Sequence, residues 1–464
     1  MAKKDKITLL SKITMGVISE KISHFGEFAG AASNIAFNYR KLNGFEGFTP
    51  DEATDFAKSV TTVFKGFPKP LARRIFEAYN PAKDLSPQDQ LEFSYLLENT
   101  RDILLAVLPV LQEANPTYLQ GQFFGKILRS PGKIRGYAPP FERRKRWEEK
   151  LGIEMPWVLA LDVTSRCNIQ PPCKGCYAGE YQGKDPSFED LDRIVGEAQD
   201  LGISNILVLG GEPLLRKKEL LELQKRHKEL GYFVFTNATL LDRETIEEFL
   251  KTGANTHWLL HIQGDKELTD RDMKPGIFEK ALQAMANLRE ARIPFGFSTS
   301  VTQENFSKVT SPEFLEFISA QGAIIGLYFP YVALGYQPDF GQELTAQQRQ
   351  EFREKASLFV RNGILAVNPE EVIAHKGGCV AAVKYVHVDS KGHLKPCVFI
   401  DAHDGTNVYD PGMSLKKALT SDFMRGCQSI QFNPGRTRCL ARDGRHELRE
   451  IVEKTGAYST EKTR

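Results

Sequence analysis

The sequence predicts an α/β protein: a partial, TIM-like barrel of six βα units, preceded by a helical region and followed by a small cysteine-containing domain. Three observations support this fold class. Strand-like and helix-like segments alternate from residue 156 to about residue 365. Before residue 140, apolar residues recur at helical spacing, and after residue 365 a hairpin pattern and four cysteines follow. A serial βα repeat implies a parallel sheet with helices outside it.

The composition is that of an ordinary soluble globular chain. The 464 residues are 41% hydrophobic and 26% charged, and the formal net charge is +2. This length allows two or three domains. Because so small a net charge does not select nucleic acid, we expect no nucleic-acid partner. The longest apolar run, Ile103 to Leu111, is too short to span a bilayer, and the basic N-terminus lacks the core of a signal peptide. We therefore expect a cytoplasmic protein.

Residues 1–145 are predicted to form a helical N-terminal domain that ends in a basic linker. The segments with helical periodicity are 10–28, 50–65, 70–80 and 86–113. Residues 126–150 carry nine Lys or Arg against three Glu, and 13 of the 30 Phe lie in the first 150 positions. The basic stretch is either a solvated linker or domain edge, or a surface for anionic lipid or nucleic acid. A peripheral membrane contact therefore stays open.

Strands separated by helices are predicted between residues 150 and 365. The six strands are expected at 157–163, 205–209, 232–236, 256–262, 294–301 and 323–330. Ser187, with Asp190 three residues later, predicts a helix that ends near Leu201. Active sites of parallel α/β sheets lie beyond the carboxyl ends of the strands. Three cysteines, a Gly-Gly-Glu-Pro stretch and Asn237 all fall at such ends, which predicts the functional site there.

The seven cysteines divide into a group of three and a group of four. Cys167, Cys173 and Cys176 lie within ten residues, after the first predicted strand, and the other four lie between residues 379 and 439. An odd number in a chain with no secretion signal argues against a disulfide scaffold. Three thiolates can hold three irons of a cubane cluster and leave the fourth open to an incoming ligand. The structural alternative is a zinc knuckle.

The segment 157–305 resembles the radical S-adenosylmethionine (SAM) superfamily. The three cysteines match its cysteine loop, and Tyr177 matches the aromatic residue that usually follows the last cysteine. Gly210-Gly211-Glu212-Pro213 matches the GGEP motif, whose backbone and Glu hold the SAM amino group in this family. Asn237 resembles the Asn of the TNG stretch at the third strand. The resemblance implies a [4Fe–4S] cluster and SAM as cofactors.

Two features depart from the family's usual pattern. Five residues, rather than three, separate Cys167 from Cys173. His261 stands where the family often has Ser, and it brings a titratable group to a strand end. It packs or hydrogen-bonds to SAM, or it transfers a proton as the candidate catalytic residue. Ser298 and Ser300 alternate on one face of the next strand, where they line the ribose site or face solvent.

The C-terminal cysteines resemble those of the auxiliary-cluster domains called SPASM and Twitch. Twelve residues separate Cys379 from Gly392, and four residues separate Gly392 from Cys397, as in the hairpin that opens such domains. Cys427 and Cys439 complete a set of four thiolates. The resemblance therefore implies a second, auxiliary [4Fe–4S] cluster. Buried free cysteines are the structural alternative.

This auxiliary domain is expected at residues 366–445, after a barrel that occupies residues 150–365. A hairpin is predicted from Tyr385–Asp389 and His393–Phe399. A charged tail follows at residues 446–464.

These features predict an enzyme that cleaves SAM reductively and generates a 5′-deoxyadenosyl radical, which abstracts hydrogen from a substrate. Peptide, lipid and small-molecule substrates stay open, and an electron donor such as flavodoxin or ferredoxin is an implied partner. The alternative is a non-catalytic iron–sulfur or zinc protein that acts in electron transfer. SAM binding distinguishes the two, because an electron carrier needs no open iron beside a GGEP motif.

Overall fold

The computed structural model describes residues 140–178, 184–253, 255–359, 365–367, 379–431 and 439–459. The chain divides into two compact units, residues 1–132 and 133–464. The predicted N-terminal helices, the Phe-rich region and the membrane contact therefore lie outside the described residues. Within the described ranges, no helix is long and apolar enough to cross a bilayer.

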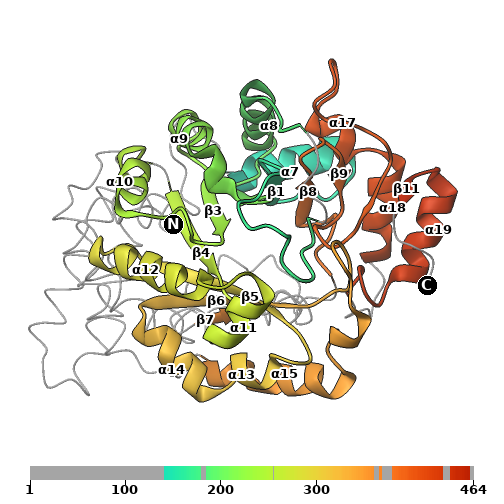
Figure 1. Ribbon diagram of the computed structural model, residues 1–464. Coiled ribbons are helices and arrows are strands. Elements are labelled where there is room, and N and C mark those ends of the chain that lie inside the picture. The colour runs from blue at the N-terminus through green and yellow to red at the C-terminus, as the bar shows by residue number, and fades with distance from the viewer. Residues whose placement is uncertain are drawn as a thin grey trace, which may run out of the picture. The chain divides into compact units, whose positions relative to one another are not determined.

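A mainly parallel sheet forms the centre of the second unit (Figure 1). Within the described residues it has nine strands in the order β7-β6-β5-β4-β3-β2-β1-β8-β9, and each neighbouring pair except β8 with β9 is parallel. The strands are β1 (Val158–Asp162), β2 (Asn205–Leu209), β3 (Gly231–Thr236), β4 (Asn255–His261), β5 (Phe295–Val301), β6 (Ala323–Pro330), β7 (Leu365–Val367), β8 (Tyr385–Val388) and β9 (Leu394–Lys395). The six predicted strands and their parallel order are confirmed.

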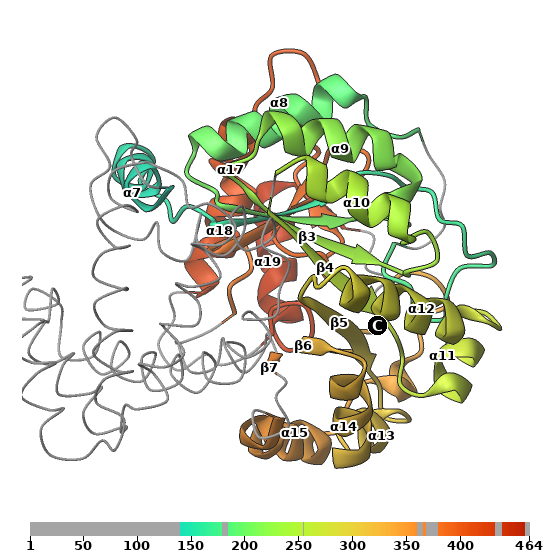
Figure 2. The ribbon, with the colours of Figure 1, turned by 90° about the vertical axis from the view of Figure 1, so that its left-hand side faces the viewer.

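Helices surround this sheet (Figures 1 and 2). They are α7 (Pro140–Leu151), α8 (Phe188–Asp200), α9 (Lys217–Arg226), α10 (Arg243–Lys251), α11 (Lys266–Asp272), α12 (Ile277–Glu290), α13 (Phe306–Val309), α14 (Pro312–Ala320), α15 (Ala346–Phe359), α17 (Leu415–Leu419), α18 (Asp422–Gln431) and α19 (Arg445–Thr455). Short 3₁₀ helices are η3 (Pro213–Arg216) and η4 (Phe340–Gln342), and β10 (Ala402–His403) pairs with β11 (Tyr458–Ser459). As predicted, Ser187 caps α8 by accepting a hydrogen bond from Asp190 N.

These helices cover the outer face of the sheet. Trp258 of β4 packs edge-on against Phe249 of α10, with ring centroids 5.0 Å apart. Phe297 of β5 contacts Phe314 of α14 in the same way, at 5.8 Å. Aromatic pairs of this geometry add to the stabilisation from buried area. The apolar residues that alternate along the strands therefore form a continuous core with the helices.

The inner face of the sheet is curved, as expected of a partial barrel. Phe235 of β3 and Phe329 of β6 belong to strands that are not neighbours, yet their ring centroids are 6.1 Å apart. Phe399, which follows Cys397 by two residues, contacts Phe329 at 6.1 Å. All three rings are partly exposed. The interior of the barrel is therefore lined in part by aromatic side chains.

Three strands, β7, β8 and β9, extend the sheet beyond the six predicted barrel strands. β7 pairs with β6, and β8 pairs in parallel with β1, with His387 opposite Ala160. β8 and β9 form the predicted hairpin, and Gly392 at its turn has a φ of +91°, a backbone conformation that favours glycine. The hairpin that we expected in a separate C-terminal domain thus contributes its first strand to the barrel sheet.

The described end of the basic stretch is a docked helix rather than a free linker. Within α7, Arg144 Nη1 donates a hydrogen bond to Gly202 O at 3.2 Å. Trp147 Nε1 donates to Asp200 O, also at 3.2 Å. These bonds attach α7 to the turn that follows α8.

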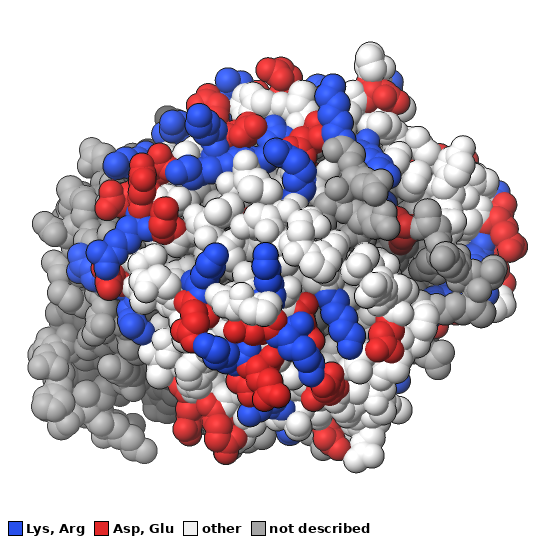
Figure 3. All heavy atoms as spheres, viewed as in Figure 1, with Lys and Arg blue, Asp and Glu red and all other residues white. Residues whose placement is uncertain are grey.

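Charged side chains of both signs are interspersed on the face drawn in Figure 3, with an uncharged band across its middle. Ion pairs account for part of this mixture. Lys266 Nζ lies 2.6 Å from Glu279 Oε1, and Lys308 Nζ lies 3.0 Å from Asp265 Oδ2. Exposed pairs of this kind contribute little to stability.

The core contact of Trp258 yields a first prediction. Its side chain is 2% exposed, so replacing Trp258 with Ala should lower the free energy of unfolding by about 3–5 kcal/mol. Chemical denaturation of cluster-free protein, followed by circular dichroism, measures this loss. Trp157 is 45% exposed, and Trp157→Ala is the matched control. Equal losses in both variants would contradict a special contribution from the buried pair.

Candidate active site

The three cysteines of the predicted cluster loop lie together beyond the carboxyl end of β1. Cys167 and Cys173 are partly buried against a small apolar cluster. The buried members of that cluster are Ile169, Met273 and Ile277. The loop therefore packs on its own Ile169, on Met273 just after α11, and on Ile277 at the start of α12.

The chemistry of these thiols fits an iron cluster. Burial raises the pKa of Cys173 to about 12, and the nearby Cys176 and Cys167 also raise it. Such thiols stay protonated at neutral pH unless a cation binds them, because a bound metal ion deprotonates its thiol ligand. Within the described residues, no three His, Cys, Asp or Glu side chains are arranged to hold a single metal ion. A cubane cluster differs, since each cysteine binds a separate iron.

The Gly-Gly-Glu-Pro stretch packs directly against the cysteine loop. Gly211 N donates to Thr164 O at 3.0 Å, and Glu212 N donates to Arg166 O at 2.8 Å. A Cβ on Gly210, whose φ is +124°, would lie 2.2 Å from Thr164 O. One on Gly211 would lie 2.0 Å from Arg166 O. Both positions therefore require glycine, because no side chain fits between these two backbones.

The Glu212 side chain is fully buried and joins the ends of β2 and β3. Its carboxylate accepts hydrogen bonds from Leu214 N at 3.0 Å, Thr236 Oγ1 at 2.8 Å and Asn237 N at 2.8 Å. Burial raises the pKa of Glu212 to about 7, against the effect of these hydrogen bonds. Pro213, the next residue, begins η3. With 0% exposure, the Glu212 carboxylate is enclosed by these donors and fixes the shape of the loop.

Asn237 connects the end of β3 to the cysteine loop. Its Nδ2 donates to Asn168 Oδ1 at 2.8 Å and lies 3.9 Å from Cys167 Sγ. Its Oδ1 accepts from Thr239 N at 3.0 Å and from Thr239 Oγ1 at 2.6 Å. The amide is therefore fixed in one orientation, with its N–H groups toward the cysteine loop. Hydrogen bonds to ligand sulfurs are one means by which proteins tune iron–sulfur clusters.

The Tyr177 hydroxyl contacts both the backbone nitrogen and the backbone oxygen of Gly210. Its Oη accepts from Gly210 N at 3.2 Å and lies 3.3 Å from Gly210 O and 3.4 Å from Asp162 Oδ1. Burial, followed by the Asp162 carboxylate, raises the pKa of Tyr177 well above its usual value. The hydroxyl is therefore a protonated donor. Sequence reasoning missed Asp162, although a carboxylate at the end of an apolar strand is a signal for a buried polar contact.

His261, the last residue of β4, lies beside Ser298 in the middle of β5. His261 Nδ1 is 3.2 Å from Ser298 Oγ. Ser298 is buried and Ser300 is partly exposed, and the strand alternation puts both on one face, as predicted. Burial lowers the pKa of His261 to about 4, despite its hydrogen bond with Ser298. The imidazole is therefore neutral at pH 7 and has no extra proton to give.

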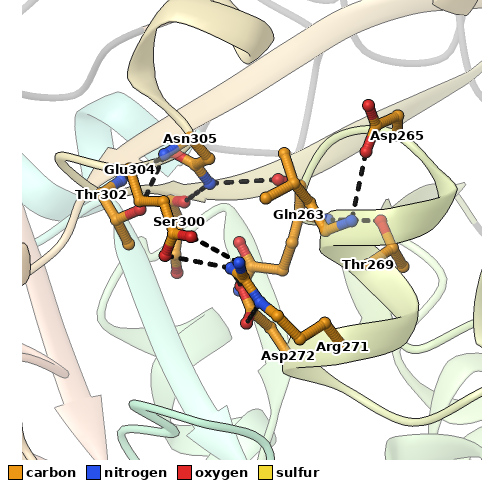
Figure 4. Close-up of polar contacts among 10 residues, drawn as sticks. Gln263, Asp265, Thr269, Arg271, Asp272, Ser300, Thr302, Glu304 and Asn305 are labelled. Carbon is orange, nitrogen blue, oxygen red and sulfur yellow. Dashed lines mark hydrogen bonds and ion pairs between the residues drawn. The ribbon is translucent and has the colours of Figure 1, made fainter.

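Polar contacts join the loops that follow β4 and β5 (Figure 4). Asn305 Nδ2 donates to Gln263 O at 3.1 Å and to Ser300 O at 2.8 Å. Asn305 is 1% exposed, so its amide nitrogen is shielded from solvent and donates to these two backbone oxygens. The two loops therefore hold their positions relative to each other.

Arg271 extends this network to the cysteine loop. Its guanidinium pairs with Glu304 after β5 and with Asp272 at 2.7 Å. The backbone oxygen of Asp272 accepts a hydrogen bond from Lys174 N at 3.0 Å. None of these residues was identified from the sequence, because ordinary surface residues carry no motif.

Three of the four C-terminal cysteines influence one another. Burial raises the pKa of Cys397 well above its usual value, and the nearby Cys379 and Cys439 raise it as well. Cys427 differs, since burial alone raises its pKa, to about 12. It is 0% exposed and lies one helical turn from the buried Phe423 of α18. Cys427 therefore lies on a buried, apolar face of α18, and we predict that its thiol does not join the other three.

Known proteins share sequence with this site. A model described as the radical SAM superfamily matches residues 161–315. The PqqA peptide cyclase of Granulibacter bethesdensis is 31% identical over 322 residues, which cover 62% of this chain and 84% of that protein. The AdoMet-dependent heme synthase of Methanosarcina barkeri is 23% identical over 274 residues, or 53% of this chain and 77% of that protein.

Solved structures share the fold. Streptococcus suis SuiB bound to S-adenosylmethionine superposes with a TM-score of 0.53 at 18% identity, covering 71% of this chain and 83% of SuiB. SuiB bound to its precursor peptide SuiA gives a TM-score of 0.53 at 17% identity, covering 72% and 84%.

The curled parallel sheet, with a three-cysteine loop and a glycine loop at its carboxyl edge, defines an iron–sulfur enzyme built on a partial barrel. This chain belongs to the radical SAM superfamily. Enzymes of this superfamily use a [4Fe–4S] cluster and SAM.

The lowered pKa of His261 yields a second prediction. In the unfolded chain the imidazole gains a proton near pH 6.5, whereas in the folded protein it does so only near pH 4. Stability that is present above pH 6.5 should therefore fall as the pH drops toward 4, by at most about 1.4 kcal/mol per pH unit from this group. Thermal unfolding of cluster-free protein across this range measures the fall.

His261→Gln should flatten this part of the profile. His446, whose side chain is 83% exposed, provides the control, because His446→Gln should leave the profile unchanged. A His261→Gln profile that coincides with that of the wild type would contradict a lowered pKa for His261.

The apolar surroundings of Cys427 yield a third prediction. Cys397→Ala should remove the auxiliary cluster and lower the iron content by about four atoms per chain, the content of one cubane. Cys427→Ala should retain this iron, because its thiol is buried on an apolar face of α18 and burial alone raises its pKa. Iron and sulfide analysis of anaerobically reconstituted protein compares the two. Equal iron loss in both variants would show that Cys427 is a ligand of the auxiliary cluster.

Proposed function

We propose that this chain cleaves SAM reductively at a [4Fe–4S] cluster bound by Cys167, Cys173 and Cys176, and abstracts hydrogen from a substrate. When bound, the cluster supplies one electron to the SAM sulfonium, and a carbon–sulfur bond breaks to give methionine and a 5′-deoxyadenosyl radical. The observation that carries this proposal is the glycine loop packed directly onto the three-cysteine loop.

The residues around the cysteine loop would bind and orient SAM. The backbone of Gly210 and Gly211 would meet the amino group, since the Glu212 carboxylate is buried and already accepts three hydrogen bonds. Ser298 and Ser300, on one face of β5, would line the ribose site. Each of these groups is held by the fold before SAM arrives, which lowers the entropic cost of orienting it.

His261 would serve this site by hydrogen bonding. Its neutral imidazole contacts Ser298 Oγ at 3.2 Å and can donate or accept one further hydrogen bond. Because its pKa is lowered to about 4, proton donation from a charged imidazolium is disfavoured at neutral pH. We therefore assign His261 the task of orienting Ser298 and a ligand beside it.

A second cluster would be bound by Cys379, Cys397 and Cys439. The mutual effect of these thiols on the pKa of Cys397 supports this set of ligands. Phe399 extends from the same segment into contact with Phe329 of the barrel interior. A cluster at this position would accept or return electrons close to a substrate in the barrel and would support the fold around it.

A peptide is the substrate class that we favour. The relative that is 31% identical over 84% of its own length is named a peptide cyclase. The partly exposed Phe235, Phe329 and Phe399 offer an apolar surface for a side chain. We further propose that residues 1–140 guide the substrate and that flavodoxin or ferredoxin supplies electrons. A cytoplasmic location and a peripheral membrane contact stay predictions.

SAM turnover tests the proposal. Reduced, anaerobically reconstituted wild-type protein should release 5′-deoxyadenosine and methionine from SAM. Replacing Cys167, Cys173 and Cys176 with Ala should abolish this release while retaining the iron of the auxiliary site. Chromatography with mass detection measures both products, and Cys427→Ala serves as a cysteine control that retains turnover. A non-catalytic iron–sulfur or zinc protein would release neither product, and full turnover in the triple variant would exclude these ligands.

A further inference from the structure

The pairing of β8 with β1 places a buried histidine beside a buried carboxylate. His387 Nε2 of β8 lies 3.1 Å from Asp162 Oδ2 at the end of β1. Their residues are 2% and 7% exposed. The contact is an ion pair when the imidazole is protonated, and it is not a well-directed hydrogen bond. A buried charge is costly unless a partner compensates it, so each residue depends on the other.

The same carboxylate reaches the glycine loop through Tyr177. Asp162 Oδ1 lies 3.4 Å from Tyr177 Oη, which in turn accepts a hydrogen bond from Gly210 N at 3.2 Å. One oxygen of the carboxylate thus faces the cysteine-loop side and the other faces β8. A continuous series of contacts therefore runs from His387 through Asp162 and Tyr177 to Gly210.

Within the described residues, Tyr177 and His387 are the two side chains with polar contacts to the Asp162 carboxylate. His387 Nδ1 is buried and has no hydrogen-bond partner in that part of the chain. Asp162 is therefore the polar contact that orients the imidazole. Removing the imidazole would leave Oδ2 buried and unpaired, which costs free energy until the carboxylate turns or takes up a proton. Either response changes the acceptor available to the Tyr177 hydroxyl.

We propose that His387 is a positioning residue for SAM: through Asp162 and Tyr177 it fixes the Gly210 peptide in the conformation that binds the cofactor. This inference rests on the proposed function of the glycine loop. If His387 has this role, the C-terminal segment contributes to the SAM site at the glycine loop. The same segment carries the auxiliary cysteines. Partners that act through another residue commonly change ligand affinity or activity without touching the ligand.

Two polar substitutions of similar size test this role. The amide nitrogen of Gln at position 387 would lie near the place of Nε2, within reach of Asp162, whereas that of Asn would lie near Nδ1. His387→Asn should weaken SAM binding by about tenfold, and His387→Gln should restore most of the affinity. Equilibrium binding of SAM to reconstituted protein in the absence of a reductant measures this, with the SAM-induced change in the electron paramagnetic resonance signal of freshly reduced, rapidly frozen protein as a second readout.

Tyr177→Phe should weaken SAM binding in the same way, and combining it with His387→Asn should add little, because both act through one carboxylate. His393, which pairs with Asp389 in the same hairpin at 3.4 Å, provides the control, and His393→Asn should bind SAM as the wild type does. Iron content and thermal midpoint verify that each variant is folded. A wild type that holds iron but binds no SAM would overturn the proposed function together with this inference. Equal SAM affinity in the wild type and in both His387 variants would overturn the inference alone.

Discussion

The buried carboxylate of Glu212 is the interaction on which the site depends. It accepts hydrogen bonds from the turn that follows it and from the end of β3, so it determines how two neighbouring loops leave the sheet. Asn237, the residue directly after β3, points its amide toward the cysteine loop. A carboxylate placed in the core costs desolvation energy, which its three donors offset in part. Because the carboxylate is fully enclosed, the loop it shapes can present its backbone to a ligand.

Much of this arrangement follows from local sequence signals. The six barrel strands, the cap of α8 and the hairpin at residues 385–399 were predicted because each depends on nearby periodicity or on a turn residue. The parallel pairing of β8 with β1 was not, since a hairpin pattern indicates only its own partner strand. Cys427 shows a second limit. Residue type identifies it as a potential ligand, whereas its position on an apolar helix face, with Phe423 one turn away, leads us to predict that it is not one.

The two cysteine groups are parts of one folded unit. β1 leads into the first group, and β8 lies beside it and leads through the hairpin to Cys397. Phe399 then turns back to contact Phe329 inside the barrel. The segment that carries Cys397 therefore also contributes an aromatic side chain to the interior of the barrel.

The sheet order also determines when the fold can close during synthesis. β1 is an interior strand, flanked by β2 on one side and by β8 on the other. On the ribosome, domains begin to fold from their N-terminal part, yet one edge of β1 stays unpaired until residue 388 has left the exit tunnel. An open apolar edge such as Val158–Asp162 is a site for wrong pairing with other chains. A nascent chain of this enzyme therefore carries an unprotected strand edge until its C-terminal hairpin has been made.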